Sequence, residues 1–376
     1  MTRKRGNGEG SIYRTKSGLW RGSYWAPTAK GMKRRYVSGK TRQECARKLT
    51  KAMSDRDGGL VFDAGSLTVG EYLNRWLKDV KDTVRESTYE RNDQLVRLHI
   101  RPALGRIKLK ALTIAHARWF YRERLNSGLA PATVHKIHIV LHKALKAAVA
   151  DGLTPRNVAA GLKLPRITRE EIDPLSPEET RRLLDAASGD RLQALYVLAI
   201  ATGLRQGELL ALKWEDVDLE RGVLRVRRTL TRTGGKVSLG EPKTKKSRRS
   251  VNLTSAAVKA LHAHLSRQLE EMERMGSLYR PGGLVFANEI GGIINPSNLR
   301  NRSFARLLKR AGLPPNTRFH DLRHTCATLL LSRNVNSKIV SEMLGHSSIA
   351  ITLDTYSHVL PTMQESAIRA LEDVLQ

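Results

Sequence analysis

The chain is poor in cysteine, in acidic side chains and in long apolar runs. Its two cysteines are too few for a disulfide framework, which favours a reducing compartment. The longest apolar candidate, residues 192–204, is interrupted by polar side chains and falls short of the roughly 18 residues that a membrane span needs. The N-terminus is basic without an apolar segment, so no secretory signal is expected. These absences argue against secreted scaffolds and membrane proteins, and they predict a cytoplasmic protein.

Basic residues, in contrast, are abundant. In 376 residues, 66 Lys and Arg stand against 36 Asp and Glu, which gives a formal net charge of +30. The excess is spread along the whole chain rather than gathered in one tail. Such a distribution is typical of a protein that surrounds nucleic acid with several modules. A merely solvated basic surface is the alternative that charge alone leaves open. The length predicts two or three domains.

The first predicted domain, residues 1–60, combines three short strands with one helix. β-rich runs at Ser11–Arg14, Leu19–Trp25 and Lys33–Ser38 are separated by turn residues. Thr41 and Glu44 form a capping box that opens the helix. Aromatic and basic residues alternate along the strands, so one face packs on the helix while the other presents cations to a DNA groove. The candidate DNA contacts are Arg14, Arg21, Arg34 and Arg35. A structural mini-domain with solvated bases fits the pattern equally well.

The second predicted domain, residues 67–163, has a helical pattern throughout. Apolar residues recur at helical spacing from Thr68 onward, and further helices are expected near 87–99, 113–126 and 132–150. The last helix carries three candidate DNA contacts, Lys136, Lys143 and Lys146. It also carries three histidines, His135, His138 and His142. Their spacing over two turns is too long for one metal ion, so we expect them to face solvent or phosphate.

The third predicted domain, residues 174–376, begins with a capping box at Ser176 and Glu179. Helical patterns dominate it. They are interrupted by β-rich runs at Val223–Leu230, Lys236–Leu239 and Ser250–Leu253, which predict one small antiparallel sheet. The predicted fold class is therefore multidomain and mainly α, with small β-sheets.

Six residues of this last segment stand in informative contexts. They are Arg205 in ATGLRQGELLAL, Lys243 in EPKTKKSRR, His320 and Arg323 in FHDLRHT, His346 in MLGHSS and Tyr356 in LDTYSH. Each of them is a weak signal when taken singly. His320 and His324 have the spacing of half a zinc site, but no Glu follows His320 and no third ligand is placed nearby. We therefore expect no metal.

Taken together and in this order, the six residues resemble the tyrosine recombinase, or phage integrase, family over residues 174–376. Residues 1–60 resemble the arm-type DNA-binding domain of lambda-like and conjugative-transposon integrases. Residues 67–163 resemble their helical, SAM-like core-binding domain. The resemblance implies a mixed α+β catalytic domain at residues 174–376. It also implies an integrase of a prophage or integrative element that binds core and arm sites on double-stranded DNA.

The resemblance also assigns roles to the six residues. Tyr356 is the nucleophile that forms a 3′-phosphotyrosine and frees a 5′-hydroxyl without ATP, metal or cofactor. Only about 0.1% of an ordinary tyrosine is ionised at pH 7, so neighbours must activate it. Arg205 and Arg323 hold the phosphate oxygens, His320 is the acid/base group and His346 hydrogen-bonds the phosphate. Lys243 protonates the leaving oxygen, although Lys245 and Lys246 lie close enough in sequence to compete for this role. Two further residues of the same basic run, Lys245 and Arg248, are candidate DNA contacts.

A second capping box at Thr362 and Glu365 predicts a short C-terminal helix with an apolar side at Ile368 and Leu371. The resemblance implies that this helix docks on a neighbouring protomer and closes a homotetramer on two DNA duplexes. An excisionase and a host DNA-bending protein are expected partners. Two alternatives remain: a non-catalytic architectural or regulatory DNA-binding protein, and a relaxing enzyme like the type IB topoisomerases.

Overall fold

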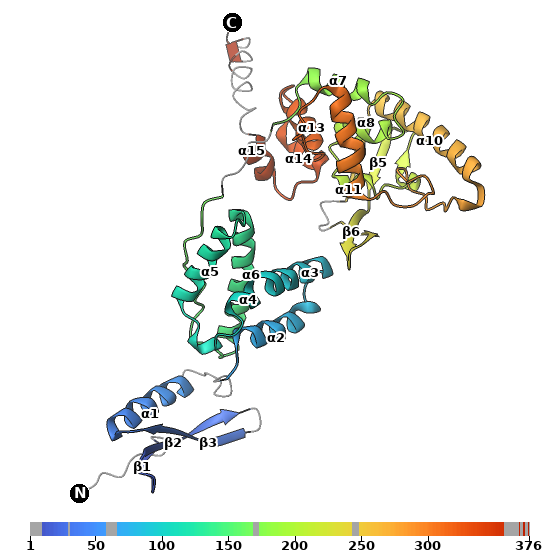
Figure 1. Ribbon diagram of the computed structural model, residues 1–376. Coiled ribbons are helices and arrows are strands. Elements are labelled where there is room, and N and C mark those ends of the chain that lie inside the picture. Colours follow the sequence, from blue (N-terminus) through green and yellow to red (C-terminus); the bar gives the residue numbers. More distant parts are fainter. Residues whose placement is uncertain are drawn as a thin grey trace. The chain divides into compact units, whose positions relative to one another are not determined.

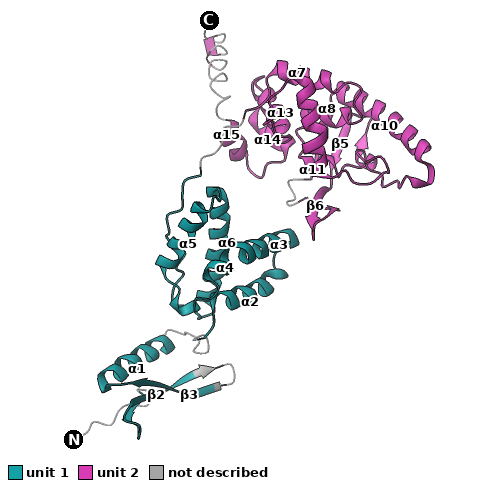
Figure 2. Cartoon of the chain, in the orientation of Figure 1, with its two compact units in different colours: residues 1–169 teal, residues 170–376 magenta. Residues whose placement is uncertain are grey.

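The computed structural model describes residues 10–28, 31–57, 66–167, 173–242 and 248–356, together with Ile368, Leu371, Glu372 and Leu375. The chain divides into two compact units, residues 1–169 and 170–376 (Figure 2). The expected boundary between the first two domains falls inside the first unit, so the division into three domains stays a prediction. None of the helices in the described ranges is both long and apolar enough to cross a membrane.

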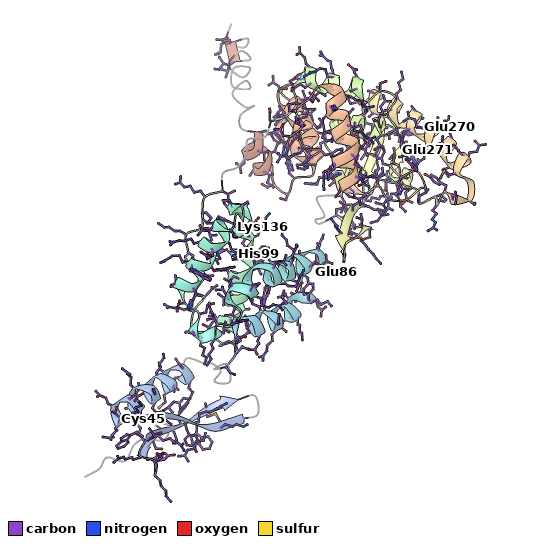
Figure 3. The ribbon with its side chains drawn as sticks, in the orientation of Figure 1. Cys45, Glu86, His99, Lys136, Glu270 and Glu271 are labelled. Carbon is purple, nitrogen blue, oxygen red and sulfur yellow. The ribbon has the colours of Figure 1, made fainter. Side chains whose placement is uncertain are left out.

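The first unit begins with the predicted antiparallel sheet and helix (Figure 1). The sheet has the order β1 (Ser11–Arg14), β2 (Trp20–Thr28), β3 (Gly31–Gly39), and α1 (Arg42–Asp57) packs against it. The Glu44 amide donates to Thr41 Oγ1 at 3.1 Å, as the predicted capping box requires. Tyr24, Ala26 and Leu49 form the small core between sheet and helix. Cys45 of α1, labelled in Figure 3, is buried.

The rest of the first unit is helical, as predicted. Its elements are α2 (Val69–Lys81), α3 (Glu86–Leu95), the π-helical turn Val96–Ile100, α4 (Arg101–Leu104), the 3₁₀ turn Leu109–Ala111, α5 (Ile114–Asn126) and α6 (Pro131–Ala150). Thr68 and Glu71 form a reciprocal capping box at the start of α2. Apolar residues on the facing sides of α2, α5 and α6 form one buried cluster that includes Trp76, Phe120 and Leu141.

The three histidines of α6 do not face solvent as expected. All three are half-buried. His138 Nδ1 lies 3.0 Å from Tyr121 Oη, and His135 Nε2 lies 2.7 Å from the Pro165 carbonyl oxygen. The His142 ring lies 5.6 Å from that of His138. These contacts arise because the histidines occupy the edge of the buried face of α6, where segments distant in sequence supply partners.

The second unit combines a helical core with two small sheets. Its first elements are α7 (Pro177–Ala186), α8 (Gln193–Thr202), α9 (Gln206–Leu209), the 3₁₀ turn Trp214–Asp216, β4 (Val217–Asp218), β5 (Val223–Val226), β6 (Thr229–Thr233), β7 (Lys236–Gly240) and β8 (Arg249–Asn252). The remaining elements are α10 (Ser255–Met275), the 3₁₀ turn Gly276–Leu278, α11 (Pro296–Asn298), the π-helical turn Leu299–Phe304, α12 (Ala305–Ala311), α13 (Asp321–Leu331), α14 (Ser337–Leu344) and α15 (Ile349–Tyr356).

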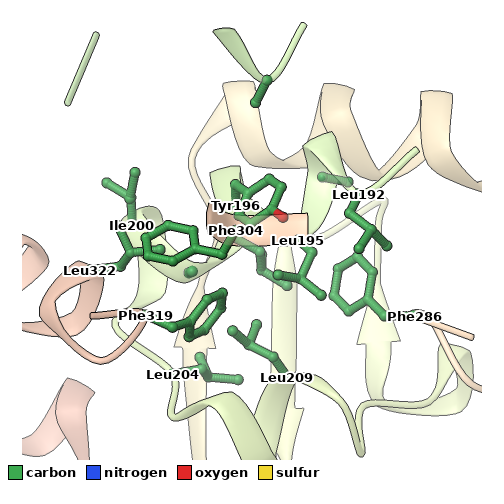
Figure 4. Packing of buried hydrophobic residues seen from close by; sticks show 14 of the residues in the cluster. Leu192, Leu195, Tyr196, Ile200, Leu204, Leu209, Phe286, Phe304, Phe319 and Leu322 are labelled. Carbon is green, nitrogen blue, oxygen red and sulfur yellow. The ribbon is translucent and has the colours of Figure 1, made fainter. Parts of the chain in front are cut away.

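Helix α8 lies at the centre of the second unit, where α10 and α13 pack against it (Figure 1). Its sequence is apolar on nearly all sides, as expected of a helix that is buried all round. Figure 4 shows Tyr196 of α8 beside Phe304 and Phe319. The ring centroids of Phe304 and Phe319 lie 5.4 Å apart in an edge-on arrangement. This core fixes the helices that carry the candidate active site.

The β-rich stretch of the second unit differs from the single sheet that the sequence predicts. The run 223–230 is divided between two strands, β5 and β6. Strand β5 pairs with β4 and β8, whereas β6 forms a separate hairpin with β7. Arg227 and Arg228, which lie between β5 and β6, both pair with the buried Asp216. These ion pairs fix the chain where it passes from one sheet to the other.

Candidate active site

Arg205 is presented by a sharp break between α8 and α9. Helix α8 ends at Thr202, its C-cap Gly203 has a left-handed φ of 60°, and Arg205 is the N-terminal cap of α9. A Cβ atom at Gly203 would lie 2.4 Å from Leu344 Cδ2 and 3.3 Å from Cys326 Sγ. Glycine is required here both for the backbone conformation and for the close approach of α13 and α14. The break therefore places Arg205 at the end of α14.

Glu208 orients Arg205 from within the domain. Arg205 Nη1 donates to Glu208 Oε1 at 2.9 Å, and the Arg205 amide donates to Oε2 at 3.0 Å. Glu208 is 4% exposed and also accepts from Arg249 Nη2 at 2.9 Å. Burial disfavours the carboxylate, but the attraction and hydrogen bonds of Arg249 and Arg205 outweigh it, so the pKa of Glu208 lies below its ordinary value. The Arg205 side chain remains 39% exposed and free to contact an anion.

Arg323 is the second arginine of the site, and it is buried. It lies in the first turn of α13, is 3% exposed, and donates through Nη1 to the Gly203 carbonyl oxygen at 2.8 Å. Its Nη2 is buried without a hydrogen-bond partner. Burial and the neighbouring Arg205 lower the pKa of the Arg323 guanidinium. Burial of a cation with an unused hydrogen-bond donor costs free energy, unless an anionic oxygen accepts a hydrogen bond from that donor.

His346 follows the left-handed Gly345 at the end of α14. The Gly345 carbonyl oxygen accepts from Arg205 Nη2 at 3.4 Å, which brings this turn next to the first arginine. His346 Nδ1 lies 2.7 Å from Thr352 Oγ1, so Nε2 is the ring nitrogen left for a ligand. Burial, together with Arg323 and Arg205, lowers the pKa of His346 to about 4, which keeps the ring neutral at pH 7.

Tyr356 is the last residue of α15 and is 1% exposed. Its ring packs in a small cluster with Ala327 and Leu331 of α13 and Val340 and Leu344 of α14. Burial raises the pKa of Tyr356 to about 12, although the nearby Arg323 acts in the opposite direction. Its hydroxyl lies 2.8 Å from His324 Nδ1. A tyrosine in this setting is un-ionised in the free protein.

His320 occupies the N-cap position of α13 without a capping hydrogen bond from its side chain, and it is exposed. Its ring meets that of His324 edge-on, with centroids 5.0 Å apart. Desolvation and the neighbouring Arg323 and Arg205 lower the pKa of His320. The described contacts therefore run from His320 to His324 and from His324 to Tyr356.

The structure gathers five of the six sequence-predicted residues in the second unit. Contacts join Arg323 to Gly203 and Arg205 to Gly345, and they bring α9, α13, α14 and α15 together. Lys243 and Lys245 lie outside the described residues. Arg248 is exposed and pairs with Glu241 at 2.9 Å. Beside it lies a cavity of about 710 Å³, whose lining includes Arg225, Arg228 and Arg249. A cavity of this charge suits phosphate groups.

Two residues of the site are not marked as such by the sequence. The sequence indicates His324 only as half of a possible zinc site, although its position next to Arg323 and one turn after His320 is a usable signal. Arg249 lies inside a basic run, where no local pattern distinguishes it. Its pairing with Glu208, 41 residues away in sequence, has no local signature.

The four candidate DNA-contacting arginines of the N-terminal sheet lie on its two opposite faces. In the antiparallel register Arg21 pairs with Tyr13, and Arg34 pairs with Trp25, so these four side chains share the face turned away from α1. The Arg21 guanidinium lies 5.7 Å from the ring centroid of Tyr36 on that same face. Two predicted contacts, Arg14 and Arg35, alternate to the opposite face. The lysines of α6, of which Figure 3 labels Lys136, are exposed.

Comparisons with known proteins identify the family of the chain. The phage integrase family matches residues 174–363, and the phage integrase N-terminal SAM-like domain matches residues 68–124. A tyrosine recombinase XerC-like protein of Caldanaerobacter subterraneus subsp. tengcongensis is 34% identical over 361 residues, covering 91% of this chain and 92% of its own length.

Two solved structures share the fold. The Tn1549 transposon integrase in complex with transposon right end DNA has a TM-score of 0.70 at 23% identity, over 80% of this chain and 99% of that one. A lambda integrase tetramer bound to a Holliday junction has a TM-score of 0.60 at 20% identity, over 94% of this chain and 96% of that one. A family match over half of the chain, together with a relative that is 34% identical over 91% of it, leads to one conclusion: the chain belongs to the phage integrase family and is a tyrosine-type site-specific DNA recombinase.

Proposed function

We propose that Tyr356 is the nucleophile of this recombinase and that Arg205 and Arg323 hold the scissile phosphate. The observation that carries the proposal is the buried, unpartnered Nη2 of Arg323, close to both Arg205 and Tyr356. In the cleavage step Tyr356 Oη attacks the phosphorus, the bond to the 5′-oxygen breaks, and the 3′-phosphate remains on the tyrosine. Rejoining reverses these bonds with a 5′-hydroxyl as nucleophile. One phosphodiester replaces another, so no ATP is consumed.

The two arginines stabilise the negative charge that develops on the non-bridging oxygens. Both stay charged and present paired donors, which suits a phosphate. Because Glu208 and the Gly203 carbonyl oxygen already hold them, little reorganisation is needed when the phosphate arrives. Loss of one such donor costs on the order of 3 kcal/mol, or 10²–10³ in rate.

The remaining site residues supply protons and hydrogen bonds. We assign proton transfer at the phosphate to His320 and a hydrogen bond to a non-bridging oxygen to His346 Nε2. Lys243 protonates the leaving 5′-oxygen. Lys245 and Lys246 are the alternative candidates for this role. With two arginines and a lysine on the phosphate, the mechanism uses side-chain cations where other phosphoryl-transfer sites use Mg²⁺.

DNA is held by basic surfaces in both units. We assign arm-site binding to the open face of the N-terminal sheet, where Arg21 and Arg34 stand among exposed aromatic side chains. Core-site binding falls to Lys136, Lys143 and Lys146 of α6 and to the arginine-lined cavity beside β8. Phosphate contacts of this kind make affinity steeply salt-dependent.

The active assembly is a homotetramer on two duplexes, as the lambda integrase tetramer on a Holliday junction suggests. Its substrate is the attachment DNA of a prophage or integrative element in the bacterial cytoplasm, and the reaction covers integration and excision. The C-terminal helix expected to join protomers lies almost wholly outside the described residues. An excisionase and a host DNA-bending protein are further proposed partners.

Adduct formation tests the proposed function. Wild type and Tyr356→Phe are incubated in EDTA, without ATP, with nicked duplexes that tile the DNA on either side of the gene. Tyr196→Phe is the matched control, because Tyr196 is also buried and hydrogen-bonded, to Ser303 at 2.8 Å. We expect a protein–DNA adduct on a denaturing gel with wild type and Tyr196→Phe but not with Tyr356→Phe. Tight binding without adduct on every duplex would favour the architectural alternative. Equal adduct on random DNA would favour a topoisomerase.

A further inference from the structure

A second cavity of the second unit, of about 300 Å³, lies beside the first turn of α9. Its walls come from α9, from the β6–β7 hairpin and from the segment that begins with α11, and β6 packs against α9. The lining of this α9 cavity includes Gln206, Arg232, Ser297 and Arg300, and none of the described residues that line it is acidic. The roles assigned above leave the cavity unused. Its guanidinium, amide and hydroxyl groups offer positive charge and hydrogen-bond donors to an anion.

The two arginines of the α9 cavity keep their charge available. Arg232 of β6 and Arg300 of the turn Leu299–Phe304 are both exposed, and within the described ranges neither pairs with a carboxylate. Four neighbouring arginines, in contrast, are neutralised by carboxylates: Arg227, Arg228, Arg248 and Arg249. Two unneutralised guanidinium groups at one cavity favour a ligand that brings negative charge from outside the domain.

Gln206 fixes Arg300 at the edge of the cavity. Gln206 Nε2 donates to the Pro296 carbonyl oxygen at 2.9 Å, and Gln206 Oε1 accepts from Arg300 Nη1 at 3.2 Å. Arg300 Nη2 also donates to Ser297 Oγ at 3.4 Å. These contacts use two of the five N–H donors of a guanidinium group, so the other three remain for a ligand. Arg300 is therefore held in place and still able to bind an anion.

Gln206 also follows Arg205 directly in the sequence. Arg205 directs its guanidinium group to Glu208 and to the Gly345 carbonyl oxygen, whereas Gln206 reaches Arg300. The first turn of α9 thus sends successive side chains to two different places. The α9 cavity is a separate site that the backbone of α9 fixes relative to Arg205.

We infer that the α9 cavity binds a non-scissile phosphate of the core-site duplex, with Arg232 and Arg300 as its ligands and Gln206 as a positioning residue. The inference deepens the proposed function and rests on it for the placement of the scissile phosphate at Arg205. Phosphates follow one another at about 3.4 Å of rise along each strand, so a duplex held at Arg205 brings further phosphates to the neighbouring surface. Contacts to two phosphates fix the register of the DNA at the bond to be cleaved.

The first test is the salt dependence of DNA binding by the full chain. Equilibrium binding is measured from about 50 to 200 mM salt for wild type, Arg232→Ala, Arg300→Ala and the control Arg221→Ala. The control removes an arginine that is also exposed but that lies near Asp218, outside the cavity. The duplex is the most tightly bound member of the tiled set, whether or not it is cleaved, so this test does not depend on adduct formation. Thermal unfolding checks that each variant is folded.

We expect Arg232→Ala and Arg300→Ala each to lower the slope of log K against log salt by about one, because each loses one phosphate contact. Arg221→Ala should keep the wild-type slope. Gln206→Glu should act like Arg300→Ala, since a carboxylate at this position neutralises Arg300. A slope change below about half a unit in either of the two cavity-arginine variants would overturn the inference, and so would an equal change in the control.

The second test locates the contact on the DNA. Each phosphate of the bound site is replaced in turn by an uncharged methylphosphonate, and binding is compared for wild type, Arg300→Ala and Gln206→Ala. We expect one non-scissile position at which the replacement weakens wild-type binding at least about tenfold but weakens Arg300→Ala less than about twofold, because the contact can be lost only once. Gln206→Ala should reduce this difference while it keeps the wild-type salt slope, which loss of fold would not do.

Equal sensitivity of wild type and Arg300→Ala at every phosphate would overturn the inference. Absence of adduct with wild type on every duplex would instead overturn the proposed function. The salt slopes still decide whether the α9 cavity holds a phosphate in that case, so the two failures are distinguishable.

Discussion

Arg249 donates from Nη2 to Glu208 Oε2 at 2.9 Å, while the other carboxylate oxygen of Glu208 accepts from Arg205 at 2.9 Å. Arg249 also donates from Nε to the Met343 carbonyl oxygen at 2.6 Å. One buried arginine of β8 thus fastens α9, which presents Arg205, and the end of α14, which precedes His346. A Cβ atom at Gly345 would lie 2.9 Å from Arg249 Nη1, so glycine is also needed for this packing.

Arg249→Ala should destabilise the protein and remove its activity. The side chains of Arg249 and Glu208 are 7% and 3% exposed, and loss of one partner of a buried ion pair costs about 3–5 kcal/mol in the free energy of unfolding. Urea unfolding at pH 7 measures this cost. Arg221→Ala is the control, because that side chain is 83% exposed and should change the free energy by less than about 0.5 kcal/mol. A cost below about 1 kcal/mol for Arg249→Ala would contradict the proposed fastening role.

Gly203→Ala should be far more damaging than Gly189→Ala. Both glycines have a left-handed φ, of 60° and 74°, so the conformational penalty of about 1 kcal/mol is shared. Only Gly203 has a neighbour that the new methyl group would strike, Leu344 Cδ2 at 2.4 Å, whereas nothing lies within 4 Å at Gly189. We expect the Gly203 variant to lose about 2 kcal/mol more in thermal unfolding, together with adduct formation. Equal effects of the two substitutions would show that close packing at Gly203 is unimportant.

Arg323→Met should abolish cleavage with little change in stability. The Arg323 guanidinium is 3% exposed and its Nη2 has no partner in the free protein, so removal of the buried cation recovers a desolvation cost that offsets the lost hydrogen bond from Nη1 to the Gly203 carbonyl oxygen. We expect a free energy of unfolding within about 1 kcal/mol of that of wild type, and an adduct rate lowered by at least 10². Denaturant titration and the adduct assay measure the two quantities. A variant that is destabilised yet active would contradict the placement of the phosphate at Nη2.

His346 should make the protein less stable in acid. Burial and nearby cations lower its pKa from 6.5 to about 4, so the unfolded state binds more protons between these values. The free energy of unfolding therefore falls as the pH drops through this window, by up to about 3 kcal/mol from this residue near pH 4. His346→Asn should lose less stability than wild type between pH 7 and pH 4.5, whereas the exposed control His262→Asn should match wild type. Parallel pH profiles for His346→Asn and wild type would refute this assignment.

Local features of the fold could be predicted from the sequence, whereas long-range pairings could not. The capping box at Ser176 and Glu179 is present, because a cap is satisfied within one helical turn. The break at Arg227 and Arg228 could not be predicted, since it depends on Asp216 rather than on the strand pattern itself.

The same distinction holds for the candidate site. The motifs around Arg205, Arg323 and Tyr356 could be found in the sequence because the residues carry a family pattern in a fixed order. The pairing of His324 with Tyr356 could not, because it arises only when α15 folds back on α13. Burial of Arg323 was equally hidden, since a charged residue in a helical pattern is ordinarily exposed.

The attachment of DNA to Tyr356 is the central claim, and mass spectrometry of the trapped adduct tests it most directly. Wild-type adduct is digested with nuclease and trypsin, and the fragment that spans Ile339–Arg369 is sequenced by fragmentation. That fragment contains one tyrosine, Tyr356. We predict a nucleotide joined to this tyrosine through its 3′-phosphate. A nucleotide on any other residue, or an unmodified fragment from a preparation rich in adduct, would contradict the account.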